Sequence, residues 1–311
     1  AEAKPLWRLV ADLEPADLVR TIDFRHITDA LSPAEAEDLV ARARARRPQV
    51  EPELMSRGYP AYTTSAGWLG YPDDKIRTLC AAAVAEGWEA IKIKVGRDLD
   101  DDVRRCAIVR EAIGDRQMMI DANQVWEVDA AIAHVRALSA FDPYWIEEPV
   151  SPDDILGHAA VRRGVAPVRV ATGEHAHNRV MFKQLLQAGA IDVVQLDCCR
   201  LGGVSEALAV FLLAAKFDTP VCQHAGGVGL CEVAQHLAFA DALSLSGRLD
   251  DRRLEHAGHL HEPFRDPIRI RNGRYLAPEQ PGFSTEILPE SRAAYAWPDG
   301  AAWTTPAGEP V

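Results

Sequence analysis

The feature that most constrains the fold is a repeated alternation of short β-rich runs and helix-forming stretches, which starts near residue 59. The β-rich runs are 60–66, 89–95, 117–122, 144–148, 168–173, 192–197, 219–224 and 243–247. Helical patterns occupy 72–86, 101–113, 129–139, 179–188, 204–216 and 228–240. This order predicts a parallel sheet with right-handed crossovers, and eight units of about 25 residues favour closure into a TIM-type α/β barrel. An open, doubly wound sheet is the alternative, but no GxGxxG motif follows the first strand.

Two flanks lie outside this alternation. Residues 1–58 hold a helix that Ser32 and Pro33 open, together with an arginine-rich segment that we expect to be exposed. Residues 278–311 are rich in proline and glycine, and we expect them to form a tail on the outside. The barrel itself is predicted to span 59–277.

Charge and cysteine content limit the classes of partner. The net charge of −12 argues against nucleic acid or an anionic membrane and leaves a small molecule as the expected ligand. The six cysteines form no CxxC pair, which predicts reduced thiols in a cytoplasmic protein rather than disulfides or a zinc site. No apolar run approaches the roughly 20 residues of a membrane span, and the first residues lack the layout of a signal peptide.

The run "AIKIKV" at 90–95 raises the question of where its lysines point. Side chains alternate faces along a strand, so Lys92 and Lys94 share one face, and the neighbouring isoleucines and valine share the other. An edge strand with one solvated face is the simplest interpretation of such a pattern. The other possibility is that both lysines point into the barrel mouth, with the apolar face against the outer helices.

Ionisable side chains recur where the predicted strands end, which is the end of a barrel where functional groups gather. They are Lys92 and Lys94, Asp121, Glu147, Glu174, Asp197 and His224. An isolated buried charge is costly, so several charges at one rim indicate a common purpose.

Three of these residues suit a metal ion. Asp121, Glu147 and Glu174 are about one βα unit apart, so their carboxylates should converge on one point and repel one another. A hard divalent cation resolves that repulsion, and Mg²⁺ leaves coordination positions open for substrate oxygens. We therefore predict one Mg²⁺ per site.

The remaining groups suit acid and base chemistry. A partly desolvated lysine beside a cation can act as a base near neutral pH, and two ammonium groups this close lower each other's pKa. Asp197 and His224 end adjacent predicted strands, where a carboxylate would fix the imidazole tautomer. Together with a metal that binds a carboxylate, these groups fit removal of the proton next to that carboxylate through a stabilised enediolate.

Several motifs resemble a known family. The KxK pair, "DANQ" at 121–124, "IEEP" at 146–149, "TGEH" at 172–175 and "QLD" at 195–197 with His224 are similar to the mandelate racemase branch of the enolase superfamily. Longer runs, such as "GYPAYTTSAGWLGY" at 58–71 and "HAGGVGLCE" at 224–232, resemble the L-fuconate dehydratases. The resemblance implies a (β/α)7β barrel and an N-terminal capping domain, of which residues 1–58 would hold only a last helix and a connecting segment.

The resemblance also implies a role for each residue. Asp121, Glu147 and Glu174 would bind Mg²⁺. Lys94 would remove the proton from C2, and His224, held by Asp197, would protonate the departing 3-hydroxyl. Lys92 would neutralise the substrate carboxylate, while Asn123 and Glu255, which follows the predicted eighth strand, would contact substrate near the metal.

The function implied is a hydro-lyase that converts L-fuconate to 2-keto-3-deoxy-L-fuconate. A dehydratase or epimerase for another acid sugar is an alternative, because a capping domain supplies much of the selectivity. A barrel without a cap that serves as a binding protein with little activity is a second alternative. Apolar surface left uncovered by a cap would favour a homo-oligomer.

Overall fold

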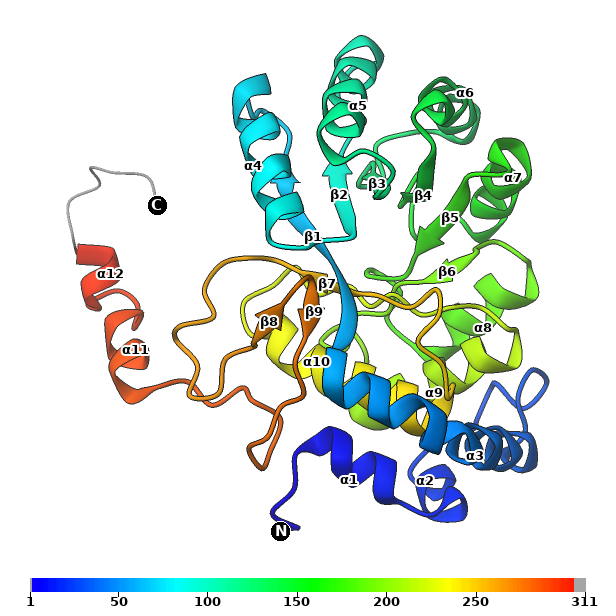
Figure 1. The fold of residues 1–311 in the computed structure, drawn as a ribbon. Coiled ribbons are helices and arrows are strands. Elements are labelled where there is room, and N and C mark those ends of the chain that lie inside the picture. Colours follow the sequence, from blue (N-terminus) through cyan, green and yellow to red (C-terminus); the bar gives the residue numbers. More distant parts are fainter. Residues whose placement is uncertain (1, 305–311) are drawn as a thin grey trace.

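The computed structural model describes residues 2–304, and its strands form the expected barrel (Figure 1). Six parallel strands lie side by side in the order of the sequence. They are β1 (Tyr59–Gly67), β2 (Ala90–Lys94), β3 (Gln117–Asp121), β4 (Pro143–Glu147), β5 (Arg169–Thr172) and β6 (Val193–Val194). Neighbouring strands in unbroken chain order are what right-handed βα crossovers produce.

Two further segments close the barrel between β6 and β1. They are residues 221–224 at the seventh strand position and β7 (Leu254–His256) at the eighth. Val221 forms a single parallel bridge with Val194 of β6, and the Glu255 amide donates to the Gln223 carbonyl at 3.2 Å. β7 then pairs in parallel with β1, where Tyr62 lies opposite Glu255. The predicted barrel is therefore confirmed, and the open sheet is excluded.

The prediction that residues 243–247 form the eighth strand is wrong. Residues 243–247 form no strand, because Asp241–Leu245 is a π-helical turn, η2, that continues α10 (Leu230–Ala240). Leu243 and Leu245 are buried, and η2 packs extensively against the helix at 33–57. A short apolar run fits a buried helix as well as a buried strand, so periodicity alone cannot separate the two.

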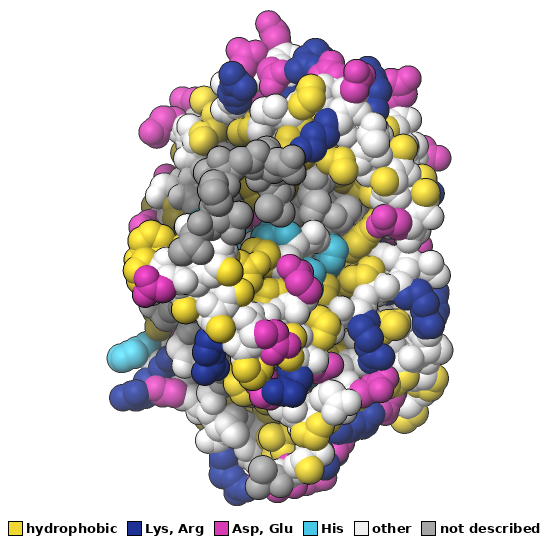
Figure 2. Space-filling view, turned by 90° about the vertical axis from the view of Figure 1, so that its left-hand side faces the viewer, with side chains coloured by type: hydrophobic (Ala, Val, Ile, Leu, Met, Phe, Trp, Pro, Cys, Tyr) yellow, Lys and Arg dark blue, Asp and Glu magenta, His cyan; other side chains and the backbone are white. Residues whose placement is uncertain are grey.

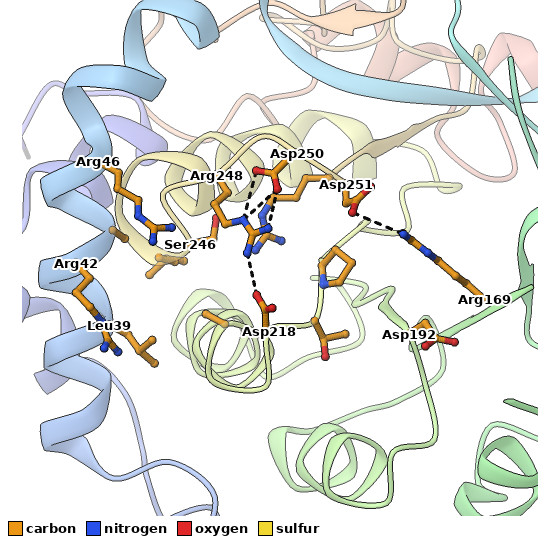
Figure 3. Close-up of a pocket in the computed structure, with 16 residues that line it drawn as sticks. Leu39, Arg42, Arg46, Arg169, Asp192, Asp218, Ser246, Arg248, Asp250 and Asp251 are labelled. Atoms are coloured by element: carbon orange, nitrogen blue, oxygen red, sulfur yellow. Dashed lines mark hydrogen bonds and ion pairs between the residues drawn. The ribbon is translucent and has the colours of Figure 1, made fainter. Parts of the chain in front are cut away.

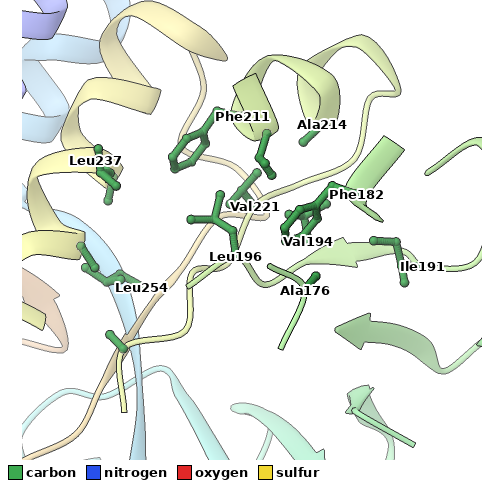
Figure 4. Packing of buried hydrophobic residues seen from close by; sticks show 14 of the residues in the cluster. Ala176, Phe182, Ile191, Val194, Leu196, Phe211, Ala214, Val221, Leu237 and Leu254 are labelled. Atoms are coloured by element: carbon green, nitrogen blue, oxygen red, sulfur yellow. The ribbon is translucent and has the colours of Figure 1, made fainter. Parts of the chain in front are cut away.

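Helices surround the strands as the outer layer (Figure 1). They are α4 (Asp73–Ala85), α5 (Leu99–Ile113), α6 (Val128–Leu138) with the short η1 (Ser139–Phe141), α7 (Ile155–Val165), α8 (Arg179–Gln187), α9 (Val204–Lys216) and α10. The sequence analysis did not predict α7, where Asp154 caps the first turn by accepting from the Gly157 amide. Between the strands and α8, α9 and α10 lies a dense apolar layer that includes Phe182, Leu196 and Phe211 (Figure 4).

Residues before the barrel form α1 (Leu6–Asp12), α2 (Pro15–Arg20) and α3 (Pro33–Arg57). Ser32 opens α3 as expected, through a capping box in which Ser32 and Glu35 bond each other's backbone amides. The arginine-rich segment continues this helix through Pro48 and Pro52 to Gly58. α3 packs against η2 and α9, and α1 packs against α10, so this flank lies on the barrel's own helices.

The C-terminal flank begins with a hairpin of β8 (Ile270–Arg271) and β9 (Arg274–Tyr275), which pairs antiparallel with the start of β1. The chain then passes the N-terminal segment, where Pro5 and Gly282 form a bridge. Two exposed helices, α11 (Pro289–Ala294) and α12 (Ala301–Thr304), follow on the outside (Figure 1). The end of the predicted tail, 305–311, lies outside the described residues.

The two faces of β2 separate as the alternation requires. Ile91, Ile93 and Val95 belong to the main apolar cluster between strands and helices. Lys92 lies on the other face, within the barrel, next to the ring of Tyr62. The edge-strand interpretation is therefore excluded, since β2 pairs with β1 on one side and with β3 on the other.

On the face that carries the C-terminal helices, acidic and basic side chains are interspersed among apolar ones (Figure 2). Within residues 2–304, no helix has the length and apolar character needed to cross a bilayer.

Candidate active site

Lys92 lies at the centre of a cluster of charges inside the barrel mouth. Its side chain is 1% exposed. Its Nζ is 2.5 Å from Glu147 Oε1, 2.9 Å from Glu255 Oε1 and 3.3 Å from Asp121 Oδ2. The strand register produces this arrangement, because Asp121 lies opposite Glu147 on neighbouring strands. A lysine this deeply buried is tolerated because three carboxylates surround it.

Lys94 ends β2 and reaches the same carboxylate from nearer the mouth. Its Nζ is 2.5 Å from Asp121 Oδ2, and the two residues lie opposite each other in the register of β2 and β3. Asn123 also contacts this carboxylate, but through its backbone amide, which donates to Asp121 Oδ1 at 3.0 Å. Both lysines point into the mouth, as the alternation predicted.

Asp197 and His224 form the expected pair. His224 Nδ1 lies 2.9 Å from Asp197 Oδ2, and Asp197 also accepts from the Cys199 and Arg200 amides. Burial lowers the pKa of His224, but the charge of Glu255 and the bond to Asp197 outweigh it and raise the pKa to about 9. The imidazolium form is therefore favoured at neutral pH.

Glu255 connects the two halves of the site. Its Oε2 is 3.6 Å from His224 Nε2, and its Oε1 contacts Lys92. Glu174 Oε2 lies 3.5 Å from the same His224 nitrogen. An unbroken series of ionic contacts thus runs from Lys94 through Asp121, Lys92, Glu255 and His224 to Asp197. β7 occupies the eighth strand position of the barrel. Glu255 lies within this strand, whereas the sequence placed it after the eighth strand.

Burial and charge shift the pKa values of the central groups. Burial lowers the pKa of Lys92, but Glu147 and Glu255 raise it more, so the net pKa lies well above the usual value. The mutual lowering expected for the two lysines is therefore outweighed at Lys92, which acts as a fixed positive charge. Burial and the charge of Asp121 raise the pKa of Glu147 to about 8, which reflects crowded carboxylates.

The three predicted metal ligands follow neighbouring strands. Asp121 ends β3, Glu147 ends β4, and Glu174 comes two residues after β5. The donor set fits a hard divalent cation, because all three groups are carboxylates at one rim and Lys92 already places a cation between two of them.

Two other groups of three possible ligands are more compact. Within each group, the ligand atoms all lie within 4.8 Å of one another among the described residues. They are Glu148, Glu174 and His175, and Asp197, Cys198 and Cys199. Asp121 and Glu147 are in neither group, and both contact the ammonium of Lys92. The assignment of Asp121, Glu147 and Glu174 to Mg²⁺ stays a prediction.

Sequence reasoning missed several residues that hold these groups in place. Gln195 Nε2 donates to Glu147 Oε2 at 2.7 Å, and Trp145 Nε1 donates to the same oxygen at 3.1 Å. Trp145 lies two residues before Glu147 on β4, so the period of two that placed the lysines also marks it, whereas Gln195 follows the end of β6. At the rim, Glu148 contacts His175 Nδ1 at 2.6 Å.

Fold and site together define a class of protein: an α/β barrel whose carboxylates, lysines and histidine surround one mouth. Residues 75–291 match the enolase C-terminal domain-like family. The chain is 50% identical over 305 residues to the Homo sapiens protein "Mitochondrial enolase superfamily member 1", covering 97% of this chain and 69% of that protein. It is 48% identical over 310 residues to "L-galactonate dehydratase" of Hypocrea jecorina, covering 97% of this chain and 68% of that protein. The chain belongs to the enolase superfamily.

Solved structures agree with this assignment. The crystal structure of the human mitochondrial enolase superfamily member 1 superimposes with a TM-score of 0.95 at 50% identity, covering 97% of this chain and 69% of that one. The L-talarate/galactarate dehydratase of Salmonella typhimurium, solved with Mg and L-lyxarohydroxamate, superimposes with a TM-score of 0.68 at 32% identity. That match covers 84% of this chain and 65% of the other. The resemblance to the superfamily is confirmed.

Proposed function

We propose that this chain is a Mg²⁺-dependent dehydratase of sugar acids, a hydro-lyase. The observation that carries the proposal is the unbroken series of contacts from Lys94 to Asp197. It joins a lysine at one side of the mouth to a histidine–aspartate pair at the other, so a base and an acid can act on adjacent carbons of one substrate. Bound Mg²⁺ would supply positive charge at the substrate carboxylate, and Asp121, Glu147 and Glu174 would hold it.

The chain's own residues account for the proton movements. Lys94 Nζ takes the proton from C2, and the electrons of that bond form a double bond between C2 and C3. The bond from C3 to its hydroxyl breaks, and His224 Nε2 gives that oxygen a proton, so that water leaves. The resulting enol loses the proton of its C2 hydroxyl and takes up a proton at C3, which gives the 2-keto-3-deoxy acid. Lys92 neutralises the carboxylate of the substrate, and Asp197 holds the imidazole in place.

L-Fuconate is the proposed substrate, with L-galactonate as the second candidate. The two acids share their configuration from C2 to C5 and differ by one oxygen at C6. The identity to an L-galactonate dehydratase supports this stereochemical series, and the sequence motifs favour the 6-deoxy member. Residues that contact C6 would decide between the two.

The test is a comparison of 2-keto acid formation from L-fuconate, L-galactonate, galactarate and L-talarate with Mg²⁺. EDTA should abolish the reaction, and Mg²⁺ added in excess should restore it. Product formation that is unaffected by EDTA would contradict the metal dependence. Exchange of the C2 proton with solvent deuterium, without product from any of these acids, would indicate an epimerase instead.

We also propose that the chain self-associates and functions in the cytoplasm. All six cysteines are free thiols, a state that a reducing compartment maintains. Exposed apolar side chains, Trp68, Leu69, Val125, Leu156 and Val228, lie in segments that follow barrel strands. Light scattering coupled to gel filtration should give a molecular mass above that of the monomer. Leu156→Lys should lower the measured mass.

A further inference from the structure

A cavity lies at the end of the barrel opposite the proposed catalytic residues. Its volume is about 530 Å³. It is lined by α3, by the segment after α9 and by the loop at 245–252 that leads into β7 (Figure 3). Arg169 begins β5, and Asp192 comes directly before β6, so the cavity opens at the amino ends of the strands. The proposed dehydratase site uses none of its residues.

Arginines dominate the lining, in a chain whose net charge is −12. They are Arg42, Arg46, Arg169, Arg248 and Arg252. Arg42 and Arg46 are one turn apart on α3, where two like charges repel each other. Neither guanidinium forms a hydrogen bond or an ion pair within residues 2–304.

The other arginines of the same helix show that this is unusual. Arg44 donates to the Leu13 carbonyl at 2.8 Å, and Arg47 pairs with Glu51 at 2.8 Å. These two arginines, which face away from the cavity, are therefore satisfied by the protein, whereas the two that line the cavity have no partner in the described part of the chain.

Arg252 adds a buried cation to the lining. It is 5% exposed, and its Nε and Nη1 have no hydrogen-bond partner among the described residues. Its ion contact is with Asp241 at 3.4 Å, and both carboxylate oxygens of Asp241 also lack a hydrogen bond there. A buried guanidinium with unbonded donors is costly unless a ligand supplies the missing acceptors.

The acidic residues of the lining do not neutralise these cations. Asp218 and Asp250 both pair with Arg248, at 2.8 and 2.6 Å. Asp251 accepts from the Tyr144 hydroxyl at 2.9 Å and lies 3.7 Å from Arg169. The positive charge of Arg42 and Arg46 and the unbonded donors of Arg252 are therefore left for a ligand.

We propose that this cavity binds a small phosphate ester, with the phosphate held by Arg42, Arg46 and Arg252. Guanidinium groups match the geometry of phosphate oxygens and bind them through paired hydrogen bonds. A phosphate presents more acceptor oxygens than a carboxylate, which suits donors that come from two separate segments of the chain. The volume lies within the range of about 300–1,000 Å³ of small-molecule sites, so an organic group has room beside the phosphate.

Isothermal titration calorimetry with glycerol 3-phosphate tests the proposal, with inorganic phosphate and glycerol as separate titrants. Low ionic strength is needed, because salt screens exposed charges. Glycerol 3-phosphate should bind, and the double variant Arg42→Ala/Arg46→Ala should weaken binding by about tenfold or more. Arg163→Ala, which removes an exposed arginine outside the cavity, should leave the affinity unchanged. The double variant should keep full 2-keto acid formation.

Lys94→Ala separates this site from the catalytic mouth, since the lysines there could also attract phosphate. Unchanged binding in Lys94→Ala supports the proposal. Binding that Lys94→Ala abolishes and Arg42→Ala/Arg46→Ala preserves would overturn it. Equal binding of glycerol and glycerol 3-phosphate, or no binding of the ester, would also overturn it. Inorganic phosphate that binds as tightly as the ester supports the phosphate contact and shows that the organic group adds nothing.

Discussion

The two lysines of β2 differ in what surrounds them. Lys92 contacts three carboxylates and is closed off from solvent, whereas Lys94 contacts Asp121 and is partly exposed at the mouth. The ammonium of Lys92 is held in place by these carboxylates, so it suits electrostatic stabilisation of a bound substrate. Lys94 has fewer partners to lose when it exchanges a proton with a substrate, so the base is expected there.

Lys94→Ala should reduce kcat for 2-keto acid formation by about 10²–10⁴-fold, which is the usual contribution of a positioned general base. Lys94→Arg should not restore it, because a guanidinium keeps its proton in this pH range. Lys216→Ala, at the end of α9, is the control and should keep full activity. Near-normal turnover in either Lys94 variant would remove this residue from the proposed mechanism.

His224→Asn should block loss of the hydroxyl while leaving exchange of the C2 proton, because Lys94 is untouched. Proton NMR in deuterium oxide measures that exchange, and a 2-keto acid assay measures elimination. His134→Asn, on the outer helix α6, is the control. Full dehydration by His224→Asn would show that another group is the acid.

Charged site residues were predictable from sequence, because a charge that recurs at the ends of successive strands seldom serves the barrel's packing. Gln195 and Trp145 were not predicted, although both bond Glu147. Neutral polar and aromatic side chains are common in barrel interiors, so their presence at a strand end carries little information. The predicted contact of Asn123 with substrate stays a prediction, and its backbone amide donates to Asp121.

At the scale of elements, the close packing of β1 on β2 holds the lysine-bearing strand. A Cβ at Gly67 would lie 2.3 Å from Ile93 Cγ2. Gly67→Ala should therefore push β2 outward and reduce the free energy of unfolding by about 1–3 kcal/mol. Urea denaturation measures this loss, and Gly202→Ala is the control, since its Cβ would meet no atom closer than 3.9 Å. Equal stability of the two variants would contradict the packing argument.

Most helices with a clear period and cap were predictable, although α7 was not predicted despite its Asp154 cap. The helix at 99–113 begins with Asp98 as a cap and acidic residues in its first turn. The run at 243–247 has neither signal, and its first residues belong to η2, which continues α10 and packs against α3. The last strand of the barrel, β7 at 254–256, is three residues long and carries a glutamate and a histidine, so no apolar pattern identifies it as a strand.

For the molecule as a whole, His236 of α10 joins both flanks to the barrel. Its Nδ1 accepts from the Trp7 amide at 3.4 Å, and its Nε2 lies 3.0 Å from the Ser284 hydroxyl. Burial lowers the pKa of His236 to about 4. The folded protein thus holds this imidazole neutral, whereas the unfolded chain protonates it near a pH of about 6.5.

The contribution of His236 to stability should therefore be complete above about pH 7 and should fall as the pH drops towards 4. Compared with His236→Gln, the wild-type free energy of unfolding should lose about 3 kcal/mol across this interval. The difference between the two proteins is the quantity to measure, because the raised pKa of Glu147 changes stability in the opposite direction over part of the range. A difference that does not vary with pH would contradict a neutral, buried His236.

Neighbouring strands of the barrel differ in the number of residue pairs that join them. Five residue pairs join β2 to β3. β6 has only two residues, and it meets the next strand position at the Val194–Val221 bridge and through three backbone hydrogen bonds between 194–196 and 220–224. Segments with few ladder hydrogen bonds open more often, so amide protons at 221–224 should exchange with deuterium sooner than those at 91–94. Lys94, the proposed base, would then lie where amide protons exchange slowly, and His224, the proposed acid, would lie where they exchange fast. Mild denaturant should consequently abolish elimination while proton exchange at C2 persists, so that loss of function proceeds in two stages.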